Sequence, residues 1–250
     1  AIGYDYRGSF SAKGSFDFNN WNLDFEGTFV SDDTFLRRFD LSDNTDIVST
    51  LSISKIWSNF SLSIETKHFS LLLPEKDGSE PMVFPIINLD WKPDFEFFGG
   101  KFNLNVNSVN IIRKTDGNTQ RLSIKTSWKK DIITKSGHLI DLGIFTRGDL
   151  YRSTKKYIPN NSTRLLSSNP FGDEINIGRL LPSYFMEWKY PVVSPNGHTI
   201  IEPIVNFTLA PSDKEYLKIP NEDSIAFELN SVNILDNERI QGFDRWEYGN

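Results

Sequence analysis

Short strand-like segments, joined alternately by tight turns and by long polar connections, run along the whole chain. Apolar and polar residues alternate in FSLSIE at 60–65 and in FNLNVN at 102–107. Because successive side chains of a strand point to opposite faces, each such segment has one apolar side and one polar side. No sustained run shows helical spacing. The pattern predicts an all-β fold of about twelve antiparallel strands.

The connections predict which strand ends lie together. The tight ones are expected at 19–20, 58–59, 92–94, 129–137, 194–197 and about 231–237. The long polar ones are expected at 31–45, 71–85, 107–119, 152–178 and 211–223. Consecutive antiparallel strands place successive connections at opposite ends of a sheet. The tight turns should therefore gather on one rim and the long loops on the other.

This asymmetry is typical of bacterial outer-membrane barrels, which also carry aromatic girdles at both membrane interfaces. Five of the six tryptophans lie near an expected tight turn: Trp21, Trp57, Trp91, Trp128 and Trp188. Indole rings favour the level of the lipid headgroups, so these residues predict an aromatic girdle on one rim. The alternative is an ordinary strand-rich protein whose tryptophans have no common role. We expect an antiparallel, up-and-down transmembrane β-barrel wall.

Composition excludes several other classes. The 250 residues fit one β domain over 1–250, and 38% of them are hydrophobic. A net charge of -6 without a basic run argues against nucleic acid as a partner. The chain has no cysteine and therefore no disulfide or thiolate metal site. No apolar stretch reaches the length of about 18 residues that a membrane helix needs, whereas a barrel strand needs only about 9–11 alternating residues.

Both ends of the sequence are abrupt. The chain is in strand-like pattern by Tyr4 and Tyr6, without an initiator methionine or a signal peptide, and it stops at Gly249-Asn250 after a charged aromatic segment. We therefore expect an internal piece of a longer protein. Its sheet should be a partial, open barrel, about half of a large barrel wall, whose closing strands lie outside this chain.

A set of motifs in fixed order resembles the LptD family of LPS-assembly outer-membrane proteins, in its alphaproteobacterial form. The motifs are Val30-Ser31-Asp32, Phe35-Leu36-Arg37, Pro81 to Ile86, Gly99-Gly100, Arg179-Leu180-Leu181-Pro182, Ile201 to Val205, Ile219 to Ser224 and Glu238 to Gly249. The similarity spans nearly the whole chain and is strongest from Arg179 onward. The chain departs from the family at Asn230, where an aspartate is usual, and at Leu235-Asp236, where a Leu-Phe pair is usual.

The resemblance implies transport without covalent chemistry, no catalytic residues, no cofactor and a location in the cell outer membrane. Members of the family receive lipopolysaccharide from a periplasmic Lpt bridge, often with the plug lipoprotein LptE in the lumen, and insert it into the outer leaflet. The expected partners are therefore lipopolysaccharide, outer-membrane lipids, an LptE-like lipoprotein and the bridge. Polar-face residues expected to line the lumen are Lys101, Asn103, Asn105, Lys125, Glu187 and Lys189.

Two polar clusters flank a predicted hairpin over 224–248. They contain Asn221, Glu222, Asp223 and Ser224 on one side and Arg239, Asp244, Arg245 and Glu247 on the other. Pairing of their carboxylates with their guanidiniums would hold a loop folded inward over the lumen. This network is a candidate luminal gate for the lipid head. A purely structural ion-pair cluster is the alternative.

Other functions have weaker support. Adjacent acidic pairs such as Asp32-Asp33 point apart in extended chain, unlike the two carboxylates of a glycosidase, so we expect no enzyme. The three histidines are far apart in sequence and show no metal-ligand spacing. Two rival classes remain open, a generic outer-membrane porin or receptor and a soluble all-β carbohydrate-binding module. The module would display its tryptophans across a concave face, whereas a barrel confines them to a ring.

Overall fold

The computed structural model describes residues 7–42, 44–72, 80–113, 117–154, 156–157, 171–172, 174–228, 233 and 240–246. The strands are β1 (Ser9–Phe18), β2 (Trp21–Val30), β3 (Asp46–Ile56), β4 (Phe60–Leu71), β5 (Met82–Trp91), β6 (Lys101–Ile112), β7 (Asn118–Ile133), β8 (Leu139–Thr154), β9 (Lys156–Tyr157), β10 (Phe171–Gly172), β11 (Ile175–Lys189), β12 (Val192–Val193), β13 (Ile200–Ile201), β14 (Ile204–Leu209), β15 (Ile225–Ala226) and β16 (Ile240–Gln241). Among the described residues the single helix is α1 (Phe35–Arg38).

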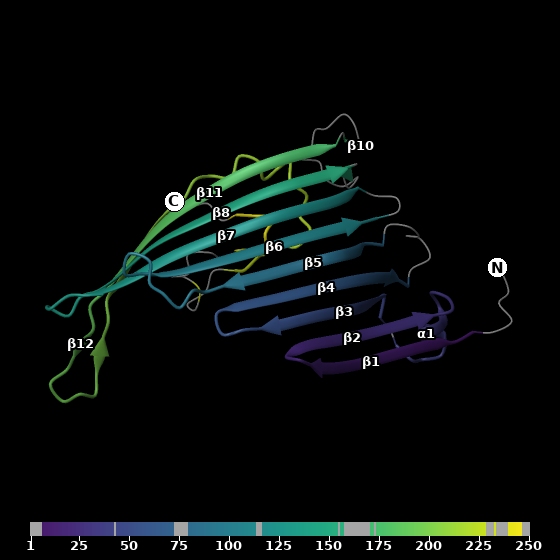
Figure 1. The fold of residues 1–250 in the computed structure, drawn as a ribbon, viewed down its shortest axis with the longest axis horizontal. Coiled ribbons are helices and arrows are strands. Elements are labelled where there is room, and N and C mark those ends of the chain that lie inside the picture. The colour runs from purple at the N-terminus through teal and green to yellow at the C-terminus, as the bar shows by residue number, and fades with distance from the viewer. Residues whose placement is uncertain are drawn as a thin grey trace. The chain divides into compact units, whose positions relative to one another are not determined.

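Ten of these strands form one antiparallel sheet. Its order is β1-β2-β3-β4-β5-β6-β7-β8-β11-β14, so neighbours in the chain are neighbours in the sheet (Figure 1). The remaining strands form three two-stranded pairs, β9 with β10, β12 with β13 and β15 with β16. Among the described residues β1 and β14 are the two edges, and the sheet is open. The predicted all-β, antiparallel up-and-down wall is confirmed, with ten strands in the main sheet.

Two connections differ from the sequence-based prediction. The expected long loop over 107–119 is mostly strand, because β6 continues to Ile112 and β7 begins at Asn118. The expected turn over 129–137 is shortened in the same way by the end of β7 at Ile133. In the first stretch Asn107 lies on the buried side of β6 and donates to the side-chain oxygen of Asn88, whereas Ser108 and Asn110 lie on the opposite face. Polar residues here therefore belong to strands and do not mark a loop.

By its contacts the chain divides into two compact units, which we describe separately. The first comprises Ala1–Leu89, Asn107–Leu122 and Tyr151–Asn176. The tight turn between β1 and β2 consists of Asn19 and Asn20, with φ of 48° and 62°. Asparagine tolerates this left-handed conformation, which two-residue hairpins require. Two small apolar clusters lie in this unit: Phe35, Leu36, Ile47 and Leu72 form one, and Val83, Val109 and Ile111 form the other.

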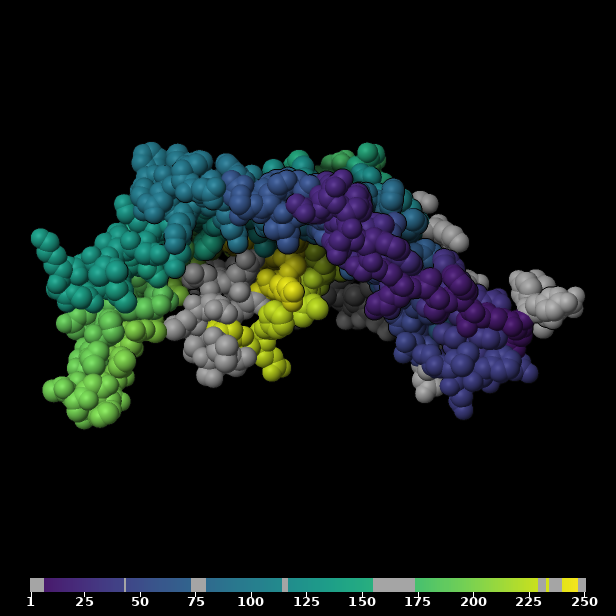
Figure 2. Space-filling model, turned by 60° about the horizontal axis from the view of Figure 1, so that its bottom comes forward, coloured from purple at the N-terminus to yellow at the C-terminus, as the bar shows by residue number. Residues whose placement is uncertain are grey.

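The second unit comprises Asp90–Val106, Ser123–Leu150 and Ile177–Asn250. In it the usual sense of burial is reversed. Leu180 on β11 is 69% exposed and Phe207 on β14 is 58% exposed, whereas Arg147 on β8 is 1% exposed. The C-terminal segment, of which the structure describes residues 211–228, 233 and 240–246, supplies part of the cover over the buried face. Part of this segment appears in yellow in Figure 2, packed on one side of the strands.

Candidate functional site

The candidate site lies on the buried face of β8 and β11. Alternation along β8 buries Arg147 and Asp149 and exposes Ile144 and Leu150. Along β11 it buries Arg179 and exposes Leu180 on the opposite face. Because side chains two residues apart share a face, the two strands bring their charged groups together in one place.

Two guanidiniums and two carboxylates form the centre of the site. The Nε atom of Arg179 donates to Oδ2 of Asp149 at 2.6 Å, and its Nη1 atom donates to Asp213 at 2.5 Å. The Nε atom of Arg147 donates to both oxygens of Asp149, at 2.9 and 3.1 Å. The formal charges cancel, two against two. Such balance is necessary because a buried charge without a partner is strongly destabilising.

The same two arginines hold the C-terminal segment. Arg179 donates to the carbonyl oxygens of Phe243, at 2.6 Å, and Asp244, at 3.2 Å. Arg147 donates to the carbonyl oxygen of Arg245, at 3.1 Å. Three consecutive carbonyl groups of the segment therefore accept hydrogen bonds from side chains of the sheet. The rings of Phe243 and Trp246 each lie 5.7 Å from the Arg147 guanidinium carbon, within the range of cation–π attraction.

Within the C-terminal segment, two loops bind each other through reciprocal caps. The Oδ2 atom of Asp244, which is completely buried, accepts from the backbone N–H groups of Glu222, at 2.7 Å, and Asp223, at 3.0 Å. In return, Asp223 Oδ1 accepts from the N–H of Phe243, and Ser224 Oγ accepts from the N–H groups of Asp244 and Arg245. The short pairing of β15 with β16 adjoins these contacts. The two loops therefore behave as one folded element.

The structure brings most of the predicted gate residues together, with different roles for some of them. Asn221 stays within its own loop and bonds to the backbone of Ser224. Arg245 donates to the carbonyl oxygens of Ile219 and Asp244, and it pairs with no carboxylate among the described residues. Arg239 and Glu247 lie outside the described residues.

The sequence analysis missed Arg147, Asp149, Arg179 and Asp213 as site residues. A signal was present, because the exposed apolar residues Ile144, Leu150 and Leu180 occupy the alternate positions of the same strands. A charged residue that alternates with apolar neighbours in a membrane wall must face away from lipid. Arg179 was noticed only as part of a family motif.

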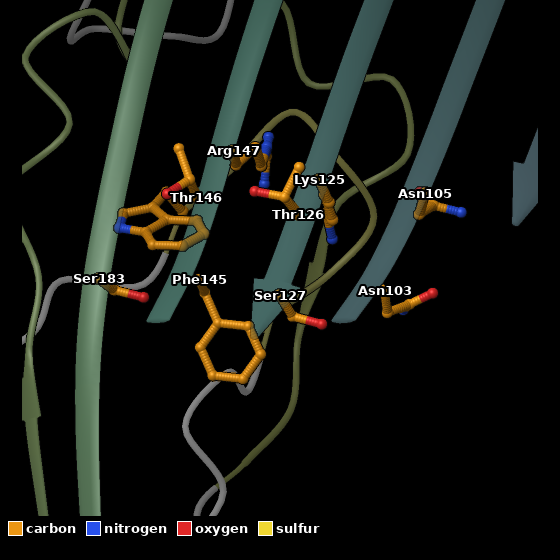
Figure 3. Close-up of a pocket in the computed structure, with 10 residues that line it drawn as sticks. Asn103, Asn105, Lys125, Thr126, Ser127, Phe145, Thr146, Arg147 and Ser183 are labelled. Carbon is orange, nitrogen blue, oxygen red and sulfur yellow. The ribbon is translucent and has the colours of Figure 1, made fainter. Parts of the chain in front are cut away.

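A pocket lies beside the charge network. Its volume is about 190 Å³, and its walls come from β6, β7, β8, β11 and the C-terminal segment (Figure 3). The residues are Asn103, Asn105, Lys125, Thr126, Ser127, Phe145, Thr146, Arg147, Ser183 and Trp246. Three of the expected lumen-lining residues, Asn103, Asn105 and Lys125, thus face one space. Arg147 belongs to both the pocket and the network.

The other expected lumen-lining residues lie elsewhere. Lys101 is exposed at the start of β6. Glu187 and Lys189 share one face of β11 and form a half-buried ion pair at 2.6 Å. None of the three lines the pocket. The polar face of this unit therefore carries the Glu187–Lys189 ion pair near one end of β11 and the pocket farther along the strands.

The five expected girdle tryptophans lie at strand ends or beside short connections. In the first unit, Trp21 and Trp57 make an edge-to-face contact at 5.9 Å. In the second, Trp91 ends β5, and Trp188 donates to Nδ1 of His138 at 3.3 Å. Trp128 lies beside a different short connection from the expected one, because its Nε1 atom donates to the carbonyl of Phe97 between β5 and β6. Their role as a membrane girdle remains a prediction.

In the part of the chain that the structure describes, no group of three or more His, Cys, Asp or Glu side chains is placed to hold a metal ion. No helix in this part of the chain combines the length and the apolar composition needed to cross a membrane.

The family model described as LptD, LPS transport system D, matches residues 5–250, nearly the entire chain. No curated protein matches the sequence.

Proposed function

The chain belongs to the LptD family of LPS transport proteins, and we propose that it forms part of an outer-membrane wall that inserts lipopolysaccharide into the outer leaflet without covalent chemistry. The family connects it with LPS transport and the outer membrane. The proposal adds the insertion step, the absence of enzymatic activity and the roles of individual residues.

The main support for this proposal is the reversed pattern of burial, in which apolar side chains are exposed and arginines are buried. In water, exposed leucine and phenylalanine side chains on one face and buried arginines on the other would be an unfavourable arrangement. In a membrane the same exposed residues meet acyl chains, and the arginines face a polar interior. Leu180 and Phe207 are not interlocked with a second sheet, as a soluble β-sandwich would require. The wall thus offers apolar surroundings to lipid tails and polar surroundings to a sugar head.

The C-terminal segment is the element that we assign as a luminal gate. It folds over the polar face and is held there mainly by hydrogen bonds to Arg147 and Arg179. Such contacts are directional, so they define one closed position. Release of the segment would uncover the polar face without any change in the strand ladder. An LptE-like lipoprotein and the periplasmic Lpt bridge are the partners that this role calls for.

Depletion of the protein in its native cell tests the proposed function. Lipopolysaccharide should disappear from newly formed outer leaflet and accumulate inside, as measured by labelling the lipid on intact cells. A generic porin of the same architecture predicts altered solute permeability with normal lipid delivery. Normal surface lipopolysaccharide after depletion would therefore refute the transport role.

A further inference from the structure

Three residues that line the pocket each carry a buried side-chain atom without a hydrogen-bond partner among the described residues. The atoms are Nη2 of Arg147, Nε1 of Trp246 and Oδ1 of Asn103. Buried polar groups in folded proteins are nearly always hydrogen-bonded, so a cluster of unpaired ones indicates a ligand or solvent site. Arg147 is the strongest indicator, since its side chain is almost completely buried and still keeps one N–H group unpaired.

The lining chemistry selects the ligand class. Lys125 contributes a positive charge, and Arg147, whose charge Asp149 balances, contributes an unpaired guanidinium nitrogen. The pocket residues that the structure describes include no aspartate or glutamate. An anionic group is therefore favoured, and a guanidinium N–H together with an indole N–H suits phosphoryl oxygens. Phe145 and Trp246 add aromatic surface, while Asn103, Asn105 and Ser183 add groups that can bond hydroxyls. This mixture of cations, aromatic rings and amides matches a phosphorylated sugar.

We propose that this pocket binds the phosphorylated sugar of the transported glycolipid head, with Arg147 and Trp246 as donors to the phosphoryl group. The assignment rests on the proposed transport function and adds a defined stopping point for the head on the polar face. Its volume of about 190 Å³ suits one phosphorylated sugar unit and not a whole oligosaccharide.

The site also depends on the closed position of the gate. Trp246 belongs to the C-terminal segment, and its neighbour Arg245 accepts a hydrogen bond from Arg147 through its carbonyl oxygen. Undocking of the segment would remove Trp246 from the pocket. Binding of the head group therefore favours the closed position, and release of the segment also releases the ligand.

The test uses the full-length protein in detergent with three probes: glucosamine 1-phosphate, glucosamine and inorganic phosphate. Ligand-detected NMR gives the dissociation constants. The sugar phosphate should bind saturably and at least tenfold more tightly than either fragment. Trp246→Phe keeps an aromatic ring but removes the unpaired N–H group, so it should weaken sugar phosphate binding about tenfold, or about 1.4 kcal/mol. The thermal stability of the ligand-free protein should fall only slightly, because that N–H group has no partner among the described residues and the phenyl ring keeps an aromatic contact with Arg147.

Trp188→Phe is the matched control, because it removes an indole N–H that already has a partner outside the pocket. It should leave the dissociation constant unchanged. Equal weakening by both variants, equal binding of inorganic phosphate and sugar phosphate, or no saturable binding would each overturn the pocket assignment. These outcomes are separate from the depletion test, since a protein without this subsite can still deliver lipopolysaccharide.

Discussion

The hairpin of β1 and β2 and the neighbouring strands β8 and β11 use charged residues on strand faces in opposite ways. In the hairpin, Lys13 faces Glu26 across the ladder at 2.8 Å, with side chains 75% and 57% exposed. In the β8 and β11 pair, Arg147, Asp149 and Arg179 are buried beneath the C-terminal segment. Apolar residues are exposed in both regions, including Phe29 in the first and Leu180 in the second.

The contribution of a charge pair to stability therefore depends on whether another segment of the chain covers it, and not on which charged residues the strands carry. An exposed pair stays solvated and contributes about 0–1 kcal/mol. A buried pair has lost its water, so each partner depends on the other and on nearby carbonyl groups. The strands of the second region therefore both support and require the segment that covers them, whereas the hairpin gains little from its ion pair.

Loss of the Arg179 guanidinium should give the largest difference in unfolding free energy between variants of the two regions. Arg179→Met leaves Asp213 without its guanidinium and frees two carbonyl groups of the C-terminal segment. We expect a loss of about 3–5 kcal/mol in the free energy of unfolding in detergent, with early proteolysis of residues 219–246. The matched change in the hairpin, Lys13→Met, should leave the free energy of unfolding nearly unchanged, because its ion pair is solvated. Equal losses of stability in the two variants would show that the buried charge pairs contribute no more than the exposed pair.

The stability of variants on the exposed apolar faces should depend on the surrounding lipid or water, and not on the C-terminal segment. Leu180→Arg places a charge on the face that we assign to lipid, and it should cost about 2–4 kcal/mol near the bilayer centre. The measurement is the free energy of unfolding in lipid bilayers, with Leu180→Met as the size control. An unchanged stability in bilayers would show that this face does not contact acyl chains.

The reciprocal caps of the C-terminal segment should be the next most sensitive feature. Gly242 has a φ of +97°, and a Cβ atom there would lie 2.4 Å from the carbonyl oxygen of Asp223. Gly242→Ala should therefore cost about 2–3 kcal/mol, through overpacking and the unfavourable backbone conformation. Gly197→Ala is the control, since Gly197 also has a positive φ but has open space around it. It should cost only about 1 kcal/mol. The free energy of unfolding measures both, and only Gly242→Ala should also reduce the protease protection of the C-terminal segment.

The strand pattern could be predicted from sequence because alternation is a local property. The period of two in 60–65 and 102–107 depends only on neighbouring residues, and both stretches are in strands. Strand ends were harder to predict. Asn107 was expected in a loop, but in a sheet with a polar face such a residue remains inside the strand. Average loop polarity is therefore a poor guide in this fold.

The candidate site was only partly predictable, because its groups meet through distant parts of the chain. The clusters around Asn221 and Asp244 were visible as dense polar motifs. Their anchors were not, since Arg147 lies 98 residues before the backbone carbonyl that it binds. Nothing in the local sequence of β8 specifies that partner. Only the sheet order and the position of the C-terminal segment bring the two together.

The smallest predicted effect concerns an ion pair of intermediate exposure next to the hairpin. Arg7 donates to both carboxylate oxygens of Asp32, at 2.8 and 2.5 Å, and this contact holds the pKa of Asp32 well below its ordinary range. A lowered pKa in the folded state means that the contribution of Asp32 to stability is present above its unfolded pKa. That contribution is lost as the pH falls through the folded value.

Asp32→Asn should therefore abolish a weak pH dependence of this loop under strongly acidic conditions and leave its behaviour at neutral pH nearly unchanged. Amide hydrogen exchange at Phe35 and Leu36, which α1 buries beside the pair, is the local measurement. Glu26→Gln supplies the control, because its exposed pair with Lys13 lies in the hairpin itself. If Asp32 titrates at the ordinary aspartate value, its contact with Arg7 is too solvated to contribute to stability. Only the buried ion pairs of the second region would then stabilise the protein, and the pair of intermediate exposure would behave like the exposed pair of the hairpin.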